Sequence, residues 1–160
     1  MAVVTYYYAA AFISAFNKEI AFTSETKINA ILTTSSYTPN QDTHNYHDDI
    51  TNQLSTANGY TAEDGSDTGL SLTTTTVTNT LNVVTLDTVD PAWTATGAGI
   101  TARRIILLDV STGVSATDPL IFWSDFGQDE TASGGGAFTY TVSASGWATV
   151  TPADATGFPA

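Results

Sequence analysis

Threonine occupies 30 of the 160 positions of this chain, and this enrichment restricts the fold more than any other feature. Threonine is branched at Cβ, which favours extended backbone over helix. It also supplies polarity without charge, and only 12% of the residues are charged. Because 42% of the residues are hydrophobic, the chain is too apolar to be intrinsically disordered. The composition therefore predicts a globular domain rich in β-strands.

Short segments of alternating polar and apolar residues, separated by turn residues, predict seven or eight strands. Residues 100–110 are apolar on both faces, so the strand they form should be central and covered on both sides. We expect a mainly β fold, an antiparallel β-sandwich or barrel with one short N-terminal helix. The predicted strands are residues 27–34, 70–78, 80–86, 100–110, 120–126, 138–143 and 147–151.

The length of the chain fits a single domain over residues 1–160, which can bury about 70% of its unfolded surface. Residues 35–62 are polar and rich in turn residues, so we expect an exposed loop there, with a helical turn near His47. Residues 152–160 are expected to form a C-terminal tail, either an ordered arm or a frayed end. The chain has no cysteine, which excludes thiol catalysis, thiolate metal sites and disulfides.

An aromatic stripe marks the predicted N-terminal helix, residues 6–16. Alanine is frequent in this segment and favours helix, while Tyr8, Phe12 and Phe16 recur at helical spacing. The stripe either packs on a sheet or docks on a neighbouring subunit. Tyr8, Phe12 and Phe16 are therefore the candidate interface residues.

Histidine and carboxylate side chains gather in the predicted loop, and such groups bind divalent metal ions. The candidate ligands are His44, His47 and Asp48. The alternative to metal binding is a structural role, in which His44 makes a loop hydrogen bond and Asp48 or Asp49 caps a short helix. The acidic run at residues 63–69 has a weak likeness to a calcium loop but lacks its regular ligand spacing, so an exposed turn is the better interpretation.

No catalytic residue or cofactor site stands out. The Gly-x-Ser-x-Gly nucleophile pattern is absent, and the glycines at 97 and 99 precede a strand, whereas a dinucleotide fingerprint follows one. We predict a protein that is not an enzyme and has no cofactor. Trp93, Trp123 and Trp147 suggest one other class, a carbohydrate-binding module with an aromatic platform. Each lies in or beside a predicted strand, however, where a core or interface role is commoner.

Sixteen acidic residues face four basic ones, which gives a net charge of −12. Nucleic-acid binding depends on Lys and Arg, so binding to nucleic acid or to an anionic membrane is disfavoured. No basic segment precedes the apolar residues 6–16, so no secretory signal is expected, and no apolar run is long enough for a transmembrane helix. Assembly of such a chain must use apolar or backbone contacts, or a basic partner.

Several longer strings of residues resemble a family of small virion-associated structural proteins of tailed bacteriophages. The likeness covers roughly residues 6–150, and the first string is the most specific. His47, Arg104, the acidic insert at 63–68 and the tail depart from that pattern. The strings are LTTSSYTPNQDTH (32–44), DDITN (48–52), GYTA (59–62), ITAR (100–103), DPLI (118–121), DFG (125–127) and SGG (133–135).

The resemblance implies a component of a phage particle, located in the virion after assembly in the host cytoplasm. The leading hypothesis is a decoration or cement subunit on the capsid exterior, which binds the major capsid protein and self-associates, with trimers expected first because capsids offer threefold positions. The alternatives are a neck, tail or fibre component. The resemblance implies no catalytic residues.

Overall fold

The computed structural model describes residues 4–23 and 27–151, and within them the chain is mainly β. Its strands pair antiparallel throughout, and its one α-helix lies near the N-terminus. The predicted fold class is therefore confirmed. None of the described helices is long and apolar enough to span a membrane. The predicted tail at 152–160 lies outside the described residues.

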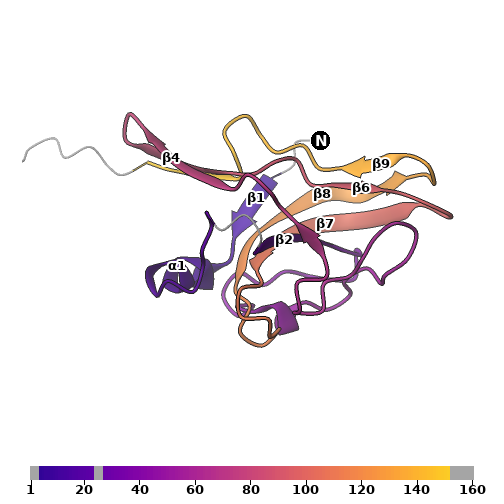
Figure 1. The fold of residues 1–160 in the computed structure, drawn as a ribbon, viewed down its shortest axis with the longest axis horizontal. Helices are drawn as coiled ribbons and strands as arrows, with labels where there is room; N and C mark the ends of the chain where they lie inside the picture. The colour runs from indigo at the N-terminus through magenta and orange to yellow at the C-terminus, as the bar shows by residue number, and fades with distance from the viewer. Residues whose placement is uncertain (1–3, 24–26, 152–160) are drawn as a thin grey trace, which may run out of the picture.

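A five-stranded sheet with the order β1-β8-β7-β2-β3 forms the centre of the molecule. The two longest strands, β7 and β8, pair along most of their length, and β2 pairs with the other edge of β7 (Figure 1). The strands of this sheet are β1 (Val4–Tyr7), β2 (Ile28–Thr33), β3 (Leu70–Ser71), β7 (Ile100–Asp109) and β8 (Leu120–Ala132).

Two smaller sheets run along one side of the central sheet (Figure 1). One has the order β10-β5-β4 and the other pairs β6 with β9. The larger hydrophobic cluster contains residues of the central sheet together with Trp93 and Phe138 from these smaller sheets and Trp147, which directly precedes β10. The strands are β4 (Thr76–Thr80), β5 (Val83–Asp87), β6 (Ala92–Thr94), β9 (Ala137–Thr139) and β10 (Ala148–Val150).

A second hydrophobic cluster lies on the opposite face of the central sheet. Ile106 and Leu108 point into it, whereas Ile105 and Leu107 point into the larger cluster, so the prediction that this strand is covered on both faces is confirmed. The chain between β2 and β3 covers this second face and includes the 3-10 turn η1 (His47–Asp49). The prediction that residues 35–62 form an exposed loop is therefore wrong in part, because Tyr37, His47 and Tyr60 are buried.

The helix is shorter than predicted, because α1 (Ala9–Phe16) begins three residues later than residue 6. Tyr6 and Tyr7 instead belong to β1, which pairs with β8 at the edge of the central sheet. Unpaired strand edges offer backbone hydrogen bonds that outweigh weak local helix propensity. Tyr8, which lies between β1 and α1, has extended dihedral angles and a buried side chain.

The number of strands is also larger than predicted, with ten in the described residues. The predicted segment 70–78 is divided between β3 and β4, which belong to different sheets. The last two predicted strands, 138–143 and 147–151, follow each other in the sequence but do not pair, since β9 pairs with β6 and β10 pairs with β5. Pairing partners depend on the three-dimensional path of the chain, which local alternation does not encode.

Candidate functional site

The three candidate metal ligands do not come together. The Nδ1 atom of His44 lies 2.8 Å from the hydroxyl of Tyr37, against which its ring stacks. His47 is buried, with Nε2 3.2 Å from the Gln53 amide, whereas Asp48 is exposed. Among the described residues no group of three histidines and carboxylates is placed to hold a metal ion. Both histidines take part in hydrogen bonds of the loop, which for His44 was the predicted alternative to metal binding.

Two buried tyrosines extend the hydrogen-bond chain from His44 towards the helix. The hydroxyls of Tyr8 and Tyr37 lie 3.0 Å apart. Burial is the main cause that raises the pKa of Tyr37 to about 12 and raises the pKa of Tyr8 further, so both phenols are neutral at physiological pH. Tyr8, a candidate interface residue, is thus an interior residue and cannot contact a partner on the same stripe as Phe12 and Phe16.

A buried pair of groups beside η1 leaves two polar atoms without partners. Within the described part of the chain, neither Nδ1 of His47 nor Oδ2 of Asp118 has a hydrogen-bond partner, although the His47 backbone N–H donates to the Asp118 carbonyl at 2.9 Å. The other carboxylate oxygen of Asp118 accepts a hydrogen bond from the Thr112 hydroxyl at 2.6 Å. Burial raises the pKa of Asp118, and the hydrogen bonds from Thr112 only partly offset this. Buried polar atoms without partners cost folding free energy, so we interpret this pair as a cost to stability.

The DFG string forms a bulge in β8. Ala102 opposes Glu130 and Arg104 opposes Asp125, so residues 126–129 have no counterpart on β7. The Asp125 carboxylate accepts hydrogen bonds from the Gly127 backbone N–H at 2.7 Å and from Arg103 Nε at 2.6 Å, and it pairs with Arg104 Nη2 at 2.9 Å. Burial would raise the pKa of Asp125, but these donors lower it overall.

Arg104, which departs from the apolar pattern of its strand, is also held by the Asp125 carboxylate. Besides the Asp125 ion pair, its guanidinium donates a hydrogen bond to the Tyr37 carbonyl and so ties the covering loop to the central sheet. Two of the four cations of the chain are therefore occupied with one structural carboxylate.

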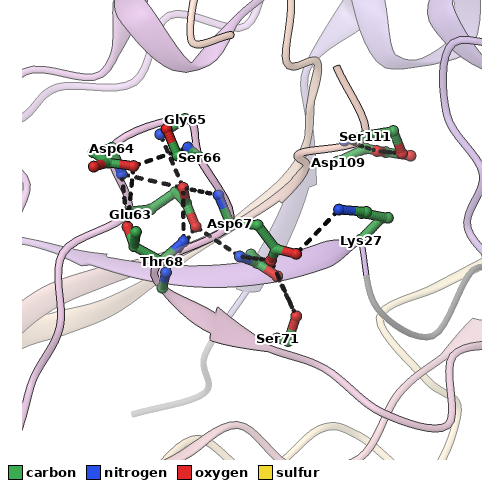
Figure 2. Close-up of polar contacts among 12 residues, drawn as sticks. Lys27, Glu63, Asp64, Gly65, Ser66, Asp67, Thr68, Ser71, Asp109 and Ser111 are labelled. Atoms are coloured by element: carbon green, nitrogen blue, oxygen red, sulfur yellow. Dashed lines mark hydrogen bonds and ion pairs between the residues drawn. The ribbon is translucent and has the colours of Figure 1, made fainter. Parts of the chain in front are cut away.

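The acidic insert encloses a single buried carboxylate, that of Glu63 (Figure 2). Its Oε1 accepts hydrogen bonds from the backbone N–H groups of Asp64, Gly65, Asp67 and Thr68, at 2.9 to 3.4 Å. Its Oε2 accepts from the Gly69 N–H at 2.8 Å and from the Asn29 amide at 2.6 Å. Burial acts to raise the pKa of Glu63, but the donors outweigh it and the pKa is lowered. The prediction of an exposed turn is wrong for this residue.

The geometry of this loop does not fit calcium binding, despite the weak likeness of its sequence to a calcium loop. Calcium is bound by carboxylate and carbonyl oxygens that point inward, whereas here the loop points its N–H groups inward at an anion. The neighbouring Asp67 is already bound, to Lys27 at 3.1 Å and to the Asn29 amide at 3.1 Å (Figure 2). The insert is thus a self-contained structural loop built on an internal carboxylate.

The tryptophans do not form a platform for a sugar. Trp93 and Trp147 are buried in the larger hydrophobic cluster, where Trp147 stacks on Tyr140 with ring centroids 4.9 Å apart. Trp123 lies on the other face and is stacked under Tyr6 at 4.4 Å. The three rings are therefore core residues or are already covered, as the structural interpretation predicted.

One end of the molecule carries an apolar surface with no charged residue in its lining. It consists of α1 and the three-stranded sheet, and an apolar groove of about 200 Å³ runs between them. Phe12, Ile13 and Phe16 project from α1 as exposed side chains, so two of the three candidate interface residues do lie on a free surface of the described chain. The lining of the apolar groove is Tyr7, Ala11, Phe12, Ala15, Ile20, Phe22, Val77, Leu86, Ile121, Phe122 and Val150.

A second, more polar groove of about 460 Å³ lies between β8 and β9. Its walls include Phe126, Phe138 and Tyr140 together with Glu130 and four threonine or glutamine side chains. It contains no histidine, no cation and only one carboxylate, so it offers no acid–base pair for catalysis.

Fold and surface together define an acidic antiparallel β protein with one uncharged apolar end. No protein-family model, curated protein or solved structure matches the chain.

Sequence reasoning missed two features of the structure. The first is Glu63, whose signal is a glutamate followed by a run of small and turn-forming residues that can wrap around it. The second is Leu81 at the tip of the β4–β5 hairpin, where 93% of the residue is exposed. Its signal is an aliphatic residue at a tight-turn position, where asparagine or glycine is the usual choice.

Proposed function

We propose that this chain is a non-catalytic structural subunit of a tailed bacteriophage particle, and within it a decoration or cement subunit on the capsid exterior. The phage assignment rests on the sequence strings that resemble small virion proteins. Its partners are the major capsid protein and further copies of this chain, with trimers the first expected arrangement. Its location is the virion.

The observation that carries the proposal is the uncharged apolar end on a chain with a net charge of −12. A surface of this kind gains free energy only when another apolar surface covers it. A decoration subunit stabilises a capsid by adding buried interface to the assembled form, which is stability linked to binding. The acidic remainder of the surface faces solvent and repels DNA.

A non-catalytic role also agrees with how three ionisable side chains, one buried and two partly buried, are used. Glu63 and Asp125 are each surrounded by hydrogen-bond donors, and His44 is bound to Tyr37. Groups held in this way stabilise loops and are not free to transfer protons to a substrate.

Quantitative mass spectrometry of purified particles tests the position. A decoration subunit is expected in on the order of hundreds of copies, whereas a neck or tail component is expected in about six or twelve. A low copy number would move the assignment to the neck or tail. Absence from the particle, or turnover of a substrate by the purified chain, would overturn the proposal.

A capsid-binding experiment tests the surface itself. Phe16→Asp and Ile13→Asp place a charge on exposed positions of α1 without disturbing the core, so both should fold and lose binding to capsids that lack this subunit. Val114→Asp, at an exposed position in the loop between β7 and β8, is the matched control and should bind normally. Equal binding by all variants would exclude α1 from the contact.

A further inference from the structure

We propose that Leu81, at the tip of the β4–β5 hairpin, inserts into the apolar groove of a second copy of this chain. This contact concerns the isolated protein and does not depend on the phage assignment. We call Leu81 the knob, and we call the apolar groove between α1 and the three-stranded sheet the socket.

The knob costs the chain free energy in two ways. Leu81 and Asn82 both have positive φ, 51° and 65°, which is the pattern of a type I′ turn. Leucine is disfavoured in this conformation, in which asparagine and glycine dominate. The same side chain is almost completely exposed to water. Neither cost is offset within one molecule. Burial of the Leu81 side chain in a partner would remove the cost of its exposure to water.

The socket has the size and the chemistry for such a side chain. Its volume is about 200 Å³, and its lining includes Ala11, Ala15, Phe22 and Val150. An apolar cavity of about 150 Å³ in another protein holds a benzene molecule, so this space admits one branched aliphatic side chain. A charged or strongly polar group would enter at the cost of its hydration.

The charge distribution selects a second copy as the occupant. The sequence has no Asp, Glu, Lys or Arg at positions 1–17, 68–86 and 131–153. These three stretches contain α1, β10 and the β4–β5 hairpin up to Leu86, which together form the knob and most of the socket; Asp87, the last residue of β5, is the one charged residue of these elements. Two copies with a net charge of −12 repel each other elsewhere, so this end is where they meet without opposing carboxylates. A basic partner would be attracted to the acidic surface instead.

The knob and the socket are neighbours on the same hairpin but are different surfaces. Val77 lines the socket, and Leu81 lies four residues further along the chain, about 13 Å away in an extended strand. Contact between unlike surfaces is head-to-tail, and it closes into a ring when the rotation between copies permits. The expected product is a closed oligomer of the full chain.

Sedimentation equilibrium over a range of concentrations tests the knob. Leu81→Asn removes the aliphatic group and supplies a residue that the turn prefers, so the hairpin should remain folded. We expect association to weaken at least about 10-fold, because a buried leucine is lost from the contact. Val114→Asn, another exposed aliphatic position, should associate like the unmodified chain. A monomer at all concentrations, or association unchanged by Leu81→Asn, would overturn the proposal.

The absence of cysteine from the sequence allows a direct test of the socket. Chains carrying Leu81→Cys are mixed with chains carrying Ala15→Cys under mild oxidation, and the 81–15 disulfide is quantified by mass spectrometry. We expect several-fold more of this disulfide than of the 114–15 disulfide formed with Val114→Cys chains, because the knob seats beside Ala15. Equal yields of the two disulfides would contradict the proposed contact.

The chain beyond β10 is the competing occupant, since Val150 lines the socket and residues 152–160 follow it. A chain truncated after Thr151 should associate as strongly as the full chain. If truncation abolishes association and Leu81→Asn does not, the C-terminal segment fills the socket and the proposal is wrong. Neither result bears on the phage assignment, which is tested separately by the copy number in purified particles.

Discussion

Glu63 illustrates how one residue can organise a loop. Its buried carboxylate is the acceptor for five backbone N–H groups and for the Asn29 amide. Hydrogen bonds to a charged group contribute more than neutral ones, and unpaired buried donors are costly. The acidic insert is therefore stabilised from inside by one of its own acidic residues.

Replacing this carboxylate is expected to destabilise the protein. Glu63→Gln keeps the size of the side chain, but its amide N–H₂ group faces donors in place of an acceptor, so we expect a loss of about 2 to 3 kcal/mol. Urea unfolding monitored by tryptophan fluorescence measures the change. Glu130→Gln, the same substitution at an exposed glutamate, should change the stability little. Equal effects of the two substitutions would contradict the role of Glu63.

The lowered pKa of Glu63 predicts a pH dependence with a definite sign. Because the folded pKa lies below the ordinary value of 4.5, the stabilisation is complete above pH 4.5 and is lost as the pH falls towards the folded value. The difference in Tm between the unmodified chain and Glu63→Gln should therefore shrink below pH 4.5. Thermal unfolding followed by circular dichroism from pH 7 to pH 3 measures it, and a constant difference would contradict the prediction.

Among the structural elements, the chain between β2 and β3 depends on close packing of its turns. A Cβ atom at Gly59 would lie 1.9 Å from the Thr94 carbonyl oxygen, and the residue also has a positive φ of 89°. Gly135 has the same φ of 89°, but a Cβ atom there meets nothing within 4 Å. A side chain at Gly59 would therefore meet both a steric clash and backbone strain, whereas a side chain at Gly135 would meet backbone strain alone.

Alanine substitution at these two positions should give different losses of stability. We expect about 1 kcal/mol for Gly135→Ala, from strain alone, and more than about 2 kcal/mol for Gly59→Ala, because the loop must move away from β6. Denaturant unfolding of both variants measures the difference. Similar values would mean that the loop around Gly59 yields without cost.

At the scale of the whole molecule, the balance of charge governs stability. Sixteen acidic residues repel one another, and three of the four basic residues are occupied in ion pairs with Asp67 and Asp125. Repulsion among exposed charges weakens as salt screens it, whereas partly buried pairs are screened less.

Stability should accordingly rise with ionic strength. Between low salt and about 0.5 M NaCl, where the screening length falls to a few ångström, we expect the Tm to increase by about 2 to 5 °C. Differential scanning calorimetry at constant pH measures the trend. A fall in Tm would indicate that the ion pairs of Arg103 and Arg104 outweigh the repulsion.

The sequence by itself determined the fold class and the central strand of this protein. Threonine content and alternation report on local backbone preference, and the apolar faces of residues 100–110 require cover on both sides. The absence of cysteine and the excess of carboxylates could also be interpreted without coordinates. These properties depend on neighbouring residues or on totals.

Only the tertiary structure decided which strands pair, that Tyr8 is interior while Phe16 is exposed, and that the candidate ligands His44 and His47 bind different partners. It likewise buried Glu63 inside its own loop and left Leu81 in water. Each of these outcomes depends on contacts between residues far apart in the chain, because burial and pairing are set by the surroundings of a side chain and not by its neighbours in sequence.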